Sequence, residues 1–151
     1  MMKYSITIML ILTALFSTAL AACQSTPEGP AISIEGAWGR PSPKVATAGA
    51  FYMLIKNEGS QADRLVAGTS AACGVVELHE SYQTEEGAMG MRPVENGIEV
   101  PAGGQTELKI GGFHIMCIDK LEDFEAGVVL PVSLSFEKSG DIEIEIEIRE
   151  P

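Results

Sequence analysis

Basic residues are scarce in this chain of 151 residues, which has 10 Lys and Arg against 21 Asp and Glu and a net charge of −11. This negative balance argues against nucleic acids and anionic lipid headgroups as partners. Aromatic residues make up only 6% of the chain, and we interpret Trp38, Phe51, Tyr52 and Phe136 as core or rim side chains. We find no nucleophile with a base, no paired catalytic carboxylates and no glycine-rich phosphate loop, so nothing indicates an enzyme.

The N-terminal segment has the features of a secretory signal. Lys3 precedes an apolar run from residue 6 to residue 22, which ends in L-A-A-C at Cys23. L-A-A-C resembles the lipobox of bacterial lipoproteins, which implies removal of residues 1–22 and diacylation of Cys23. Two acyl chains anchor a protein stably. We therefore expect an extracytoplasmic lipoprotein, on the periplasmic side or the cell surface, rather than an uncleaved anchor helix with an incidental cysteine.

Residues 23–31 are predicted to be a lipidated tether, because the stretch Q-S-T-P-E-G-P-A after Cys23 is polar and rich in turn residues. Residues 32–151 are predicted to form a single domain. The chain from Cys23 onward has 129 residues, and the loss of Lys3 leaves 9 basic against 21 acidic side chains, a net charge of −12. A chain of this size can build one hydrophobic core.

Short runs with period two predict an all-β domain, an antiparallel sandwich or Greek-key barrel. In the last run apolar and charged residues alternate without a break, which predicts that Ile142, Ile144, Ile146 and Ile148 are buried while the glutamates between them are exposed. No segment has a convincing helical period, and we find no internal repeat. The predicted strands cover residues 32–38, 48–56, 63–70, 74–80, 87–93, 97–100, 105–110, 113–118, 132–136 and 141–148.

His114 and Met116 are predicted to lie on one face of a strand, because alternate side chains share a face. An imidazole beside a thioether favours Cu(I) over hard cations. Met89 and Met91 likewise share a face, and His79 closes an earlier strand. For H-x-M alone, the alternative is that Met116 packs in the core and His114 is a hydrogen-bonded surface residue.

Several longer strings resemble the periplasmic copper chaperones of the PCuAC family. They are A-W-G-R-P-S-P, A-G-A-F-Y-M-L-I-K-N-E-G, E-L-H-E, M-G-M-R-P-V, L-K-I-G-G-F-H-I-M and P-V-S-L-S-F. The resemblance extends from about Ile34 to Ile148 and implies a cupredoxin-like fold. It assigns Cu(I) ligation to His79, Met91, His114 and Met116, with one ion per chain. Glu80 stands where many family members have methionine, and Met89 is the expected auxiliary thioether in its place.

The resemblance also implies a function and partners. The family binds Cu(I) outside the cytoplasmic membrane and delivers it, typically to the binuclear copper centre of cytochrome c oxidase, in subunit II, often beside a thiol-bearing copper chaperone. We expect this chain to be a monomeric copper carrier rather than an enzyme. Three alternatives stay open, namely copper buffering or tolerance, an electron-transfer cupredoxin, and an envelope interaction module without metal.

Cys73 and Cys117 remain once Cys23 is lipidated, and an oxidising compartment favours a disulfide between them. Period two directs Cys117 away from His114 and Met116, which argues against a fifth metal ligand. Cys73 shares its parity with His79, so the pairing requires an irregularity such as a bulge near Gly74. Two buried free thiols are the alternative.

Overall fold

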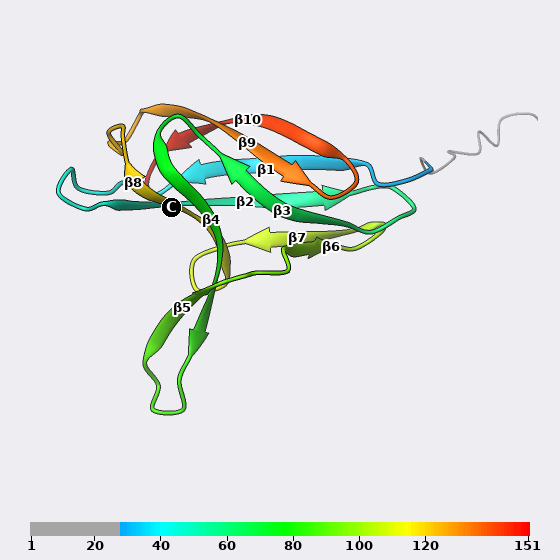
Figure 1. Ribbon diagram of the computed structural model, residues 1–151, viewed down its shortest axis with the longest axis horizontal. Coiled ribbons are helices and arrows are strands. Elements are labelled where there is room, and N and C mark those ends of the chain that lie inside the picture. The colour runs from blue at the N-terminus through cyan, green and yellow to red at the C-terminus, as the bar shows by residue number, and fades with distance from the viewer. Residues whose placement is uncertain (1–27) are drawn as a thin grey trace, which may run out of the picture.

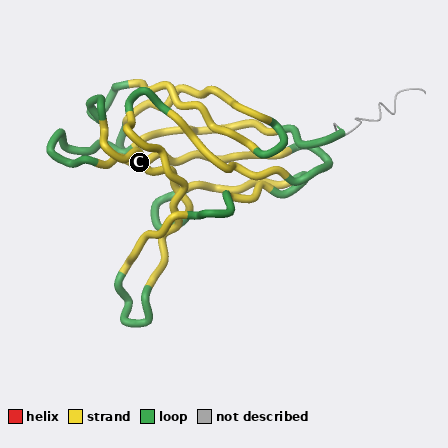
Figure 2. The backbone as a smooth tube through the Cα atoms, viewed as in Figure 1, coloured by secondary structure: helices red, strands yellow, loops and turns green. Residues whose placement is uncertain are grey.

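The computed structural model describes residues 28–151, and this part of the chain contains ten strands and no helix (Figure 2). Each predicted segment overlaps one strand, so the prediction of an all-β fold is confirmed. The strands are β1 (Ile32–Gly39), β2 (Ala48–Asn57), β3 (Asp63–Thr69), β4 (Cys73–Gln83), β5 (Met89–Pro93), β6 (Ile98–Val100), β7 (Gly104–Leu108), β8 (Phe113–Lys120), β9 (Val129–Phe136) and β10 (Gly140–Ile148).

Hydrogen bonds connect nine strands in the order β5-β4-β8-β2-β1-β10-β9-β3-β6, and β7 pairs with β2. β2 pairs with β8 through Ala48 to Phe51, and with β7 through Met53 to Asn57. β1 and β10 run parallel, whereas the other strand pairs are antiparallel. The expected antiparallel arrangement is therefore wrong for this one pair. The pair joins the first and last strands of the domain, and such a distant pairing leaves no local signal in the sequence.

The sheet bends so that strands far apart in its order come together, with β3 in contact with β4 and β6 in contact with β7. The core lies inside this bend. Alternate residues of most strands supply it, and Phe51, Ile55, Leu65 and Leu134 are fully buried. In β10 the predicted alternation is observed. Ile146 and Ile148 are fully buried, Ile142 and Ile144 pack against the core, and the glutamates between them are exposed. Full burial of one such side chain contributes about 1.5–3 kcal/mol.

The β4–β5 hairpin projects from the body of the domain (Figure 1). Its turn closes through hydrogen bonds between Thr84 and both Ala88 and Gly87, and Gly87 has a φ of 84°. This left-handed conformation suits glycine because other residues have a Cβ that clashes there. At the base of the hairpin β4 pairs with β8, and further out it pairs with β5, which carries Met89 and Met91. Strand β4 therefore connects His79 to the two methionines.

The N-terminal end of the described chain is bound to the loop after β2. Asn57 is buried, and its Oδ1 accepts hydrogen bonds from the backbone N–H groups of Ala31 and Gly59, at 2.9 and 3.0 Å. Gln61 N–H donates to the carbonyl of Gly29. The ordered body of the domain therefore begins before Ile32, and the chain enters it at the end of β1 opposite the β4–β8 pair (Figure 1).

Candidate metal centre

His79 and His114 are direct partners in the antiparallel β4–β8 ladder. Because directly opposite residues share one face, both imidazoles lie on the same side of the sheet. Their ring centroids are 5.9 Å apart, and the rings are nearly edge to face. His114 is 3% exposed and the side chain of His79 is 13% exposed. The backbone pairing thus places two shielded imidazoles next to each other.

His114 is held by the turn that precedes β8. Its Nδ1 lies 3.0 Å from the carbonyl oxygen of Gly112, which also accepts a hydrogen bond from the backbone N–H of Ser81. A carbonyl oxygen can only accept, so Nδ1 of His114 is the protonated nitrogen. Its Nε2 therefore retains the lone pair that a metal ion needs.

His79 contacts a carboxylate on its own strand. Its Nε2 lies 2.7 Å from Oε2 of Glu77, two residues earlier. Its Nδ1 is buried and has no hydrogen-bond partner in the described protein. A buried polar atom without a partner is uncommon, and a bound ligand is one physical explanation for it.

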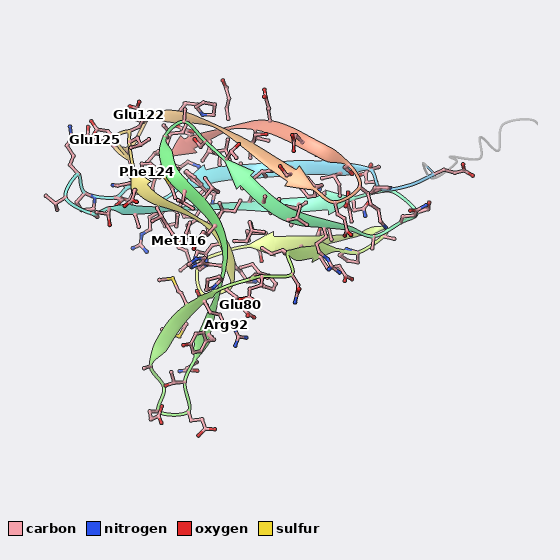
Figure 3. The ribbon with its side chains drawn as sticks, viewed as in Figure 1. Glu80, Arg92, Met116, Glu122, Phe124 and Glu125 are labelled. Atoms are coloured by element: carbon pink, nitrogen blue, oxygen red, sulfur yellow. A yellow bond between two sulfur atoms is a disulfide. The ribbon has the colours of Figure 1, made fainter. Side chains whose placement is uncertain are left out.

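Met116 and Met91 line one open cleft together with His114. The cleft has a volume of about 500 Å³. Met116 follows His114 on the same face of β8, and it pairs with Ala50 on one side and Glu77 on the other. Figure 3 shows Met116 near the base of the β4–β5 hairpin. Met91 pairs with Ser81, which shares a face with His79, and it is 59% exposed.

The predicted auxiliary residue Met89 lies further out on the hairpin. It is 63% exposed, pairs with Gln83 and does not line the cleft. Gly90, between the two methionines, lies under the ring of Tyr82, where a Cβ would come within 2.6 Å of a ring carbon. The glycine therefore lets Tyr82 cover one face of β5 while Met89 and Met91 project from the other.

Aromatic residues border the cleft on the side of β2. The ring centroid of Tyr52 lies 6.3 Å from that of His114 and 4.7 Å from that of Trp38. Burial raises the pKa of the Tyr52 phenol above its ordinary value, and the positive charge of Arg40, which also lines the cleft, opposes this effect. Tyr52 is therefore a neutral wall of the cleft at physiological pH.

The residues of the centre select the kind of metal. Among residues 28–151, no three His, Cys, Asp or Glu side chains gather as a metal site. The thioethers of Met91 and Met116, which line the cleft with His114, are the further side-chain donors available there. Thioethers are soft donors that suit Cu(I) and not Mg²⁺ or Ca²⁺.

Cys73 and Cys117 form a disulfide, which confirms the predicted pairing and rules out Cys117 as a fifth ligand. Both side chains are buried in the core, on the side of β8 opposite the cleft. The register of β4 and β8 has no inserted residue, so the irregularity is not a bulge. Instead the ladder is irregular next to Cys73, where Asp119, opposite Gly74, has a φ of 51°.

The structure adds two neighbours to the four predicted residues. Glu77 lies two residues before His79, so the alternation of a strand places both side chains on one face. Tyr52 was interpreted as a core or rim aromatic, and it is both buried and next to His114. Contact between β2 and β8 is what brings Tyr52 there, and this pairing cannot be read from either strand alone.

Solved structures similar to this chain are PCuAC domains. The apo PCuAC domain from PmoF1 is 26% identical, with a TM-score of 0.66 over 80% of this chain and 94% of that domain. The copper-bound PCuAC domain from PmoF2 is 25% identical, with a TM-score of 0.66 over 80% of this chain and 93% of that domain. The solution structure of CuI-DR1885 from Deinococcus radiodurans shares the fold, with 22% identity and a TM-score of 0.62 over 85% and 83% of the two chains. The domain is thus of the PCuAC type, and the expected cupredoxin-like fold is confirmed.

The sequence of the domain also matches a family of lipoproteins. Residues 32–148 match the family described as "Putative lipoprotein LpqE-like". This chain belongs to that LpqE-like lipoprotein family. A curated relative, "Putative lipoprotein Lxx21020" from Leifsonia xyli subsp. xyli (strain CTCB07), is 30% identical over 133 residues, which cover 87% of this chain and 78% of the relative.

The predictions for the N-terminal segment concern residues outside the described part of the chain. These are the signal peptide at residues 1–22, the lipidation of Cys23 and the first part of the tether. The structure of residues 28–151 contains no helix that is long and apolar enough to cross a membrane.

Proposed function

We propose that this protein is an extracytoplasmic copper carrier that binds one Cu(I) ion through His79, Met91, His114 and Met116. The observation that carries the proposal is the direct pairing of His79 with His114, beside a cleft that Met91 and Met116 line. The similarity to a copper-bound PCuAC domain supports copper as the cargo. The ligand set of two imidazoles and two thioethers has the softness that Cu(I) prefers.

The same ligand set favours transfer over storage. It contains no thiolate, so an acceptor with cysteine ligands would bind Cu(I) more tightly and could withdraw it. The cleft is open, and Met91 is 59% exposed, which leaves one ligand accessible to an approaching protein. An electron-transfer role has less support, because a blue-copper centre needs a cysteine ligand and both Cys73 and Cys117 are in a disulfide.

Delivery is the finer part of the proposal. We infer that the acceptor is the binuclear copper centre in subunit II of cytochrome c oxidase, with a thiol-bearing chaperone as a further partner. A diacyl group on Cys23 would confine the protein to a membrane surface. Strand β1 begins at Ile32 and reaches Trp38, the neighbour of the cleft residue Tyr52, after six residue steps, which span at most about 20 Å in an extended strand. The copper face would then point away from the anchored end.

Titration of the purified protein with Cu(I), in competition with a chromogenic chelator, tests the proposal. We expect one ion per chain. The double variant His114→Ala, Met116→Ala should lower the affinity by at least about 100-fold, or about 2.8 kcal/mol. Met91→Leu should lower it by about tenfold or more, since the thioether is lost while the side-chain volume is kept.

Met89→Leu is the matched control, because Met89 is an equally exposed methionine on the same strand outside the cleft. It should change the affinity less than about threefold. Equal affinities in the wild type and in the double variant would refute the assignment of the site. A larger loss in Met89→Leu than in Met91→Leu would move the thioether ligand to Met89.

A further inference from the structure

Each histidine of the centre has one ring nitrogen fixed by a neighbour, and the two fixed nitrogens differ. In His114 it is Nδ1, which faces the carbonyl of Gly112 at 3.0 Å. In His79 it is Nε2, which faces Oε2 of Glu77 at 2.7 Å. The two imidazoles are paired across one ladder, and yet they are oriented through opposite atoms.

The partners decide which nitrogen carries the proton. An ionised carboxylate and a carbonyl can only accept hydrogen bonds, so the nitrogen that faces each of them is the N–H donor of a neutral imidazole. The lone pairs that remain are on Nδ1 of His79 and Nε2 of His114. Nδ1 of His79 is also the one buried side-chain nitrogen or oxygen without a partner among the described residues, which leaves it free for a ligand.

Resting on the proposed copper function, we propose that Glu77 is a positioning residue of the copper site. Its carboxylate accepts a hydrogen bond from Nε2–H of His79 and so holds the ring in the tautomer that presents Nδ1 to Cu(I). The carbonyl of Gly112 accepts a hydrogen bond from Nδ1–H of His114, which then presents Nε2. A carboxylate behind a ligating imidazole also makes the ring a stronger donor. The location supports this role, because Glu77 pairs directly with Met116 and so stands within the ligand face without being a soft ligand itself.

Glu80 provides a matched control on the same strand. Its carboxylate accepts two hydrogen bonds from Arg92, at 2.9 and 3.1 Å, whereas the carboxylate bonded to His79 is that of Glu77. Figure 3 shows Glu80 and Arg92 together on the β4–β5 hairpin. Removal of this carboxylate changes the local charge by the same amount as removal of Glu77, so a difference between the two variants reports on the contact with His79.

The test combines imidazole ¹⁵N NMR on the copper-free protein with Cu(I) titration. In the wild type we expect protonated Nε2 and unprotonated Nδ1 in His79, and the reverse in His114. Glu77→Ala should give His79 a mixture of tautomers and lower Cu(I) affinity about 10- to 100-fold, the usual effect of losing such a partner. Glu77→Gln, whose amide oxygen can still accept a hydrogen bond from Nε2–H, should lose less, and Glu80→Ala should match the wild type.

Two results would overturn the role of Glu77. One is a wild-type His79 that is protonated at Nδ1. The other is Cu(I) affinity in Glu77→Ala equal to or above that of the wild type, which would mean that Glu77 competes with copper for Nε2. A wild type that binds no Cu(I) would instead refute the proposed function itself, and the role of Glu77 with it. Backbone spectra of each variant identify any loss of fold, and Glu77→Gln provides the same comparison if Glu77→Ala is unstable.

Discussion

His79 and His114 face each other across the β4–β8 ladder, with their ring centroids 5.9 Å apart. A metal–imidazole bond is about 2.0 Å long, so one ion can lie between the two rings at this spacing. Backbone hydrogen bonds set the pairing, and the flanking partners Glu77 and Gly112 set the ring orientations. If both histidines bind copper as proposed, the two nitrogen ligands are arranged before copper arrives, which lowers the cost of binding.

Removal of the disulfide should destabilise the fold without abolishing copper binding. The bond closes a loop of 44 residues between Cys73 and Cys117, and such a constraint contributes about 2–4 kcal/mol to the free energy of unfolding. The double variant Cys73→Ala, Cys117→Ala should show this loss in denaturant unfolding. Its Cu(I) affinity should stay within about tenfold of the wild type, since both cysteines lie in the core away from the cleft.

Reduced wild-type protein is the control for that variant and should show the same loss of stability. A complete loss of Cu(I) binding in a double variant that still folds would contradict the placement of Cys117 outside the copper site.

Asp63 should anchor the turn between β9 and β10 to β3. It is 2% exposed, and it accepts hydrogen bonds from the backbone N–H groups of Arg64, Lys138 and Ser139 and from the hydroxyl of Ser139. Asp63→Asn replaces one carboxylate oxygen by an amide N–H₂, which cannot accept from the two donors that face it, and leaves the other two donors with an uncharged acceptor. We expect a loss of at least about 2 kcal/mol in the free energy of unfolding.

That contribution should depend on pH in a defined direction. Burial alone would raise the pKa of Asp63, but the hydrogen bonds from Ser139, Arg64 and Lys138 together hold the pKa below its ordinary value. A depressed pKa in the folded state gives stability that is fully present above the unfolded value of about 3.9 and is lost as pH falls through the folded pKa. The difference between wild type and Asp63→Asn should therefore shrink below about pH 3.9, and a difference independent of pH would contradict this explanation.

Anchoring and delivery can be tested in cells. Cys23→Ser should block lipidation and leave the precursor uncleaved or mislocalised, whereas a form that starts at Gln24 behind an ordinary secretory signal should be soluble and bind copper. Under copper limitation, deletion of the protein should lower cytochrome c oxidase activity, and added copper should restore it. Normal oxidase activity in the deletion strain at scarce copper would remove the delivery role and favour copper buffering.

The strands could be predicted from the sequence because alternation is a local property. Ile146 and Ile148 are buried where the alternation places them, and the same rule separates His114 and Met116 from Cys117 on opposite faces of β8. The parity rule fails at Cys73, since the rule assumes regular strands and the ladder beside Cys73 is irregular at Asp119.

The contacts between strands could not be predicted from the sequence. The parallel pairing of β1 with β10 and the contact of Tyr52 with His114 depend on which strands become neighbours. The hydrogen bond of Glu77 to His79 depends on a rotamer, so the pattern could place the two side chains on one face but could not join them. The ligand set was inferred from the family resemblance. In the structure, Met91, His114 and Met116 line one cleft, and His79 pairs directly with His114.

X-ray absorption at the copper edge of the protein loaded with one equivalent of Cu(I) tests the central claim most directly. If His79, His114, Met91 and Met116 are the ligands, the spectrum should require two nitrogen and two sulfur scatterers, with one sulfur lost in Met91→Leu and one nitrogen lost in His79→Ala. A first shell of sulfur alone, or of nitrogen and oxygen without sulfur, would contradict the proposed site.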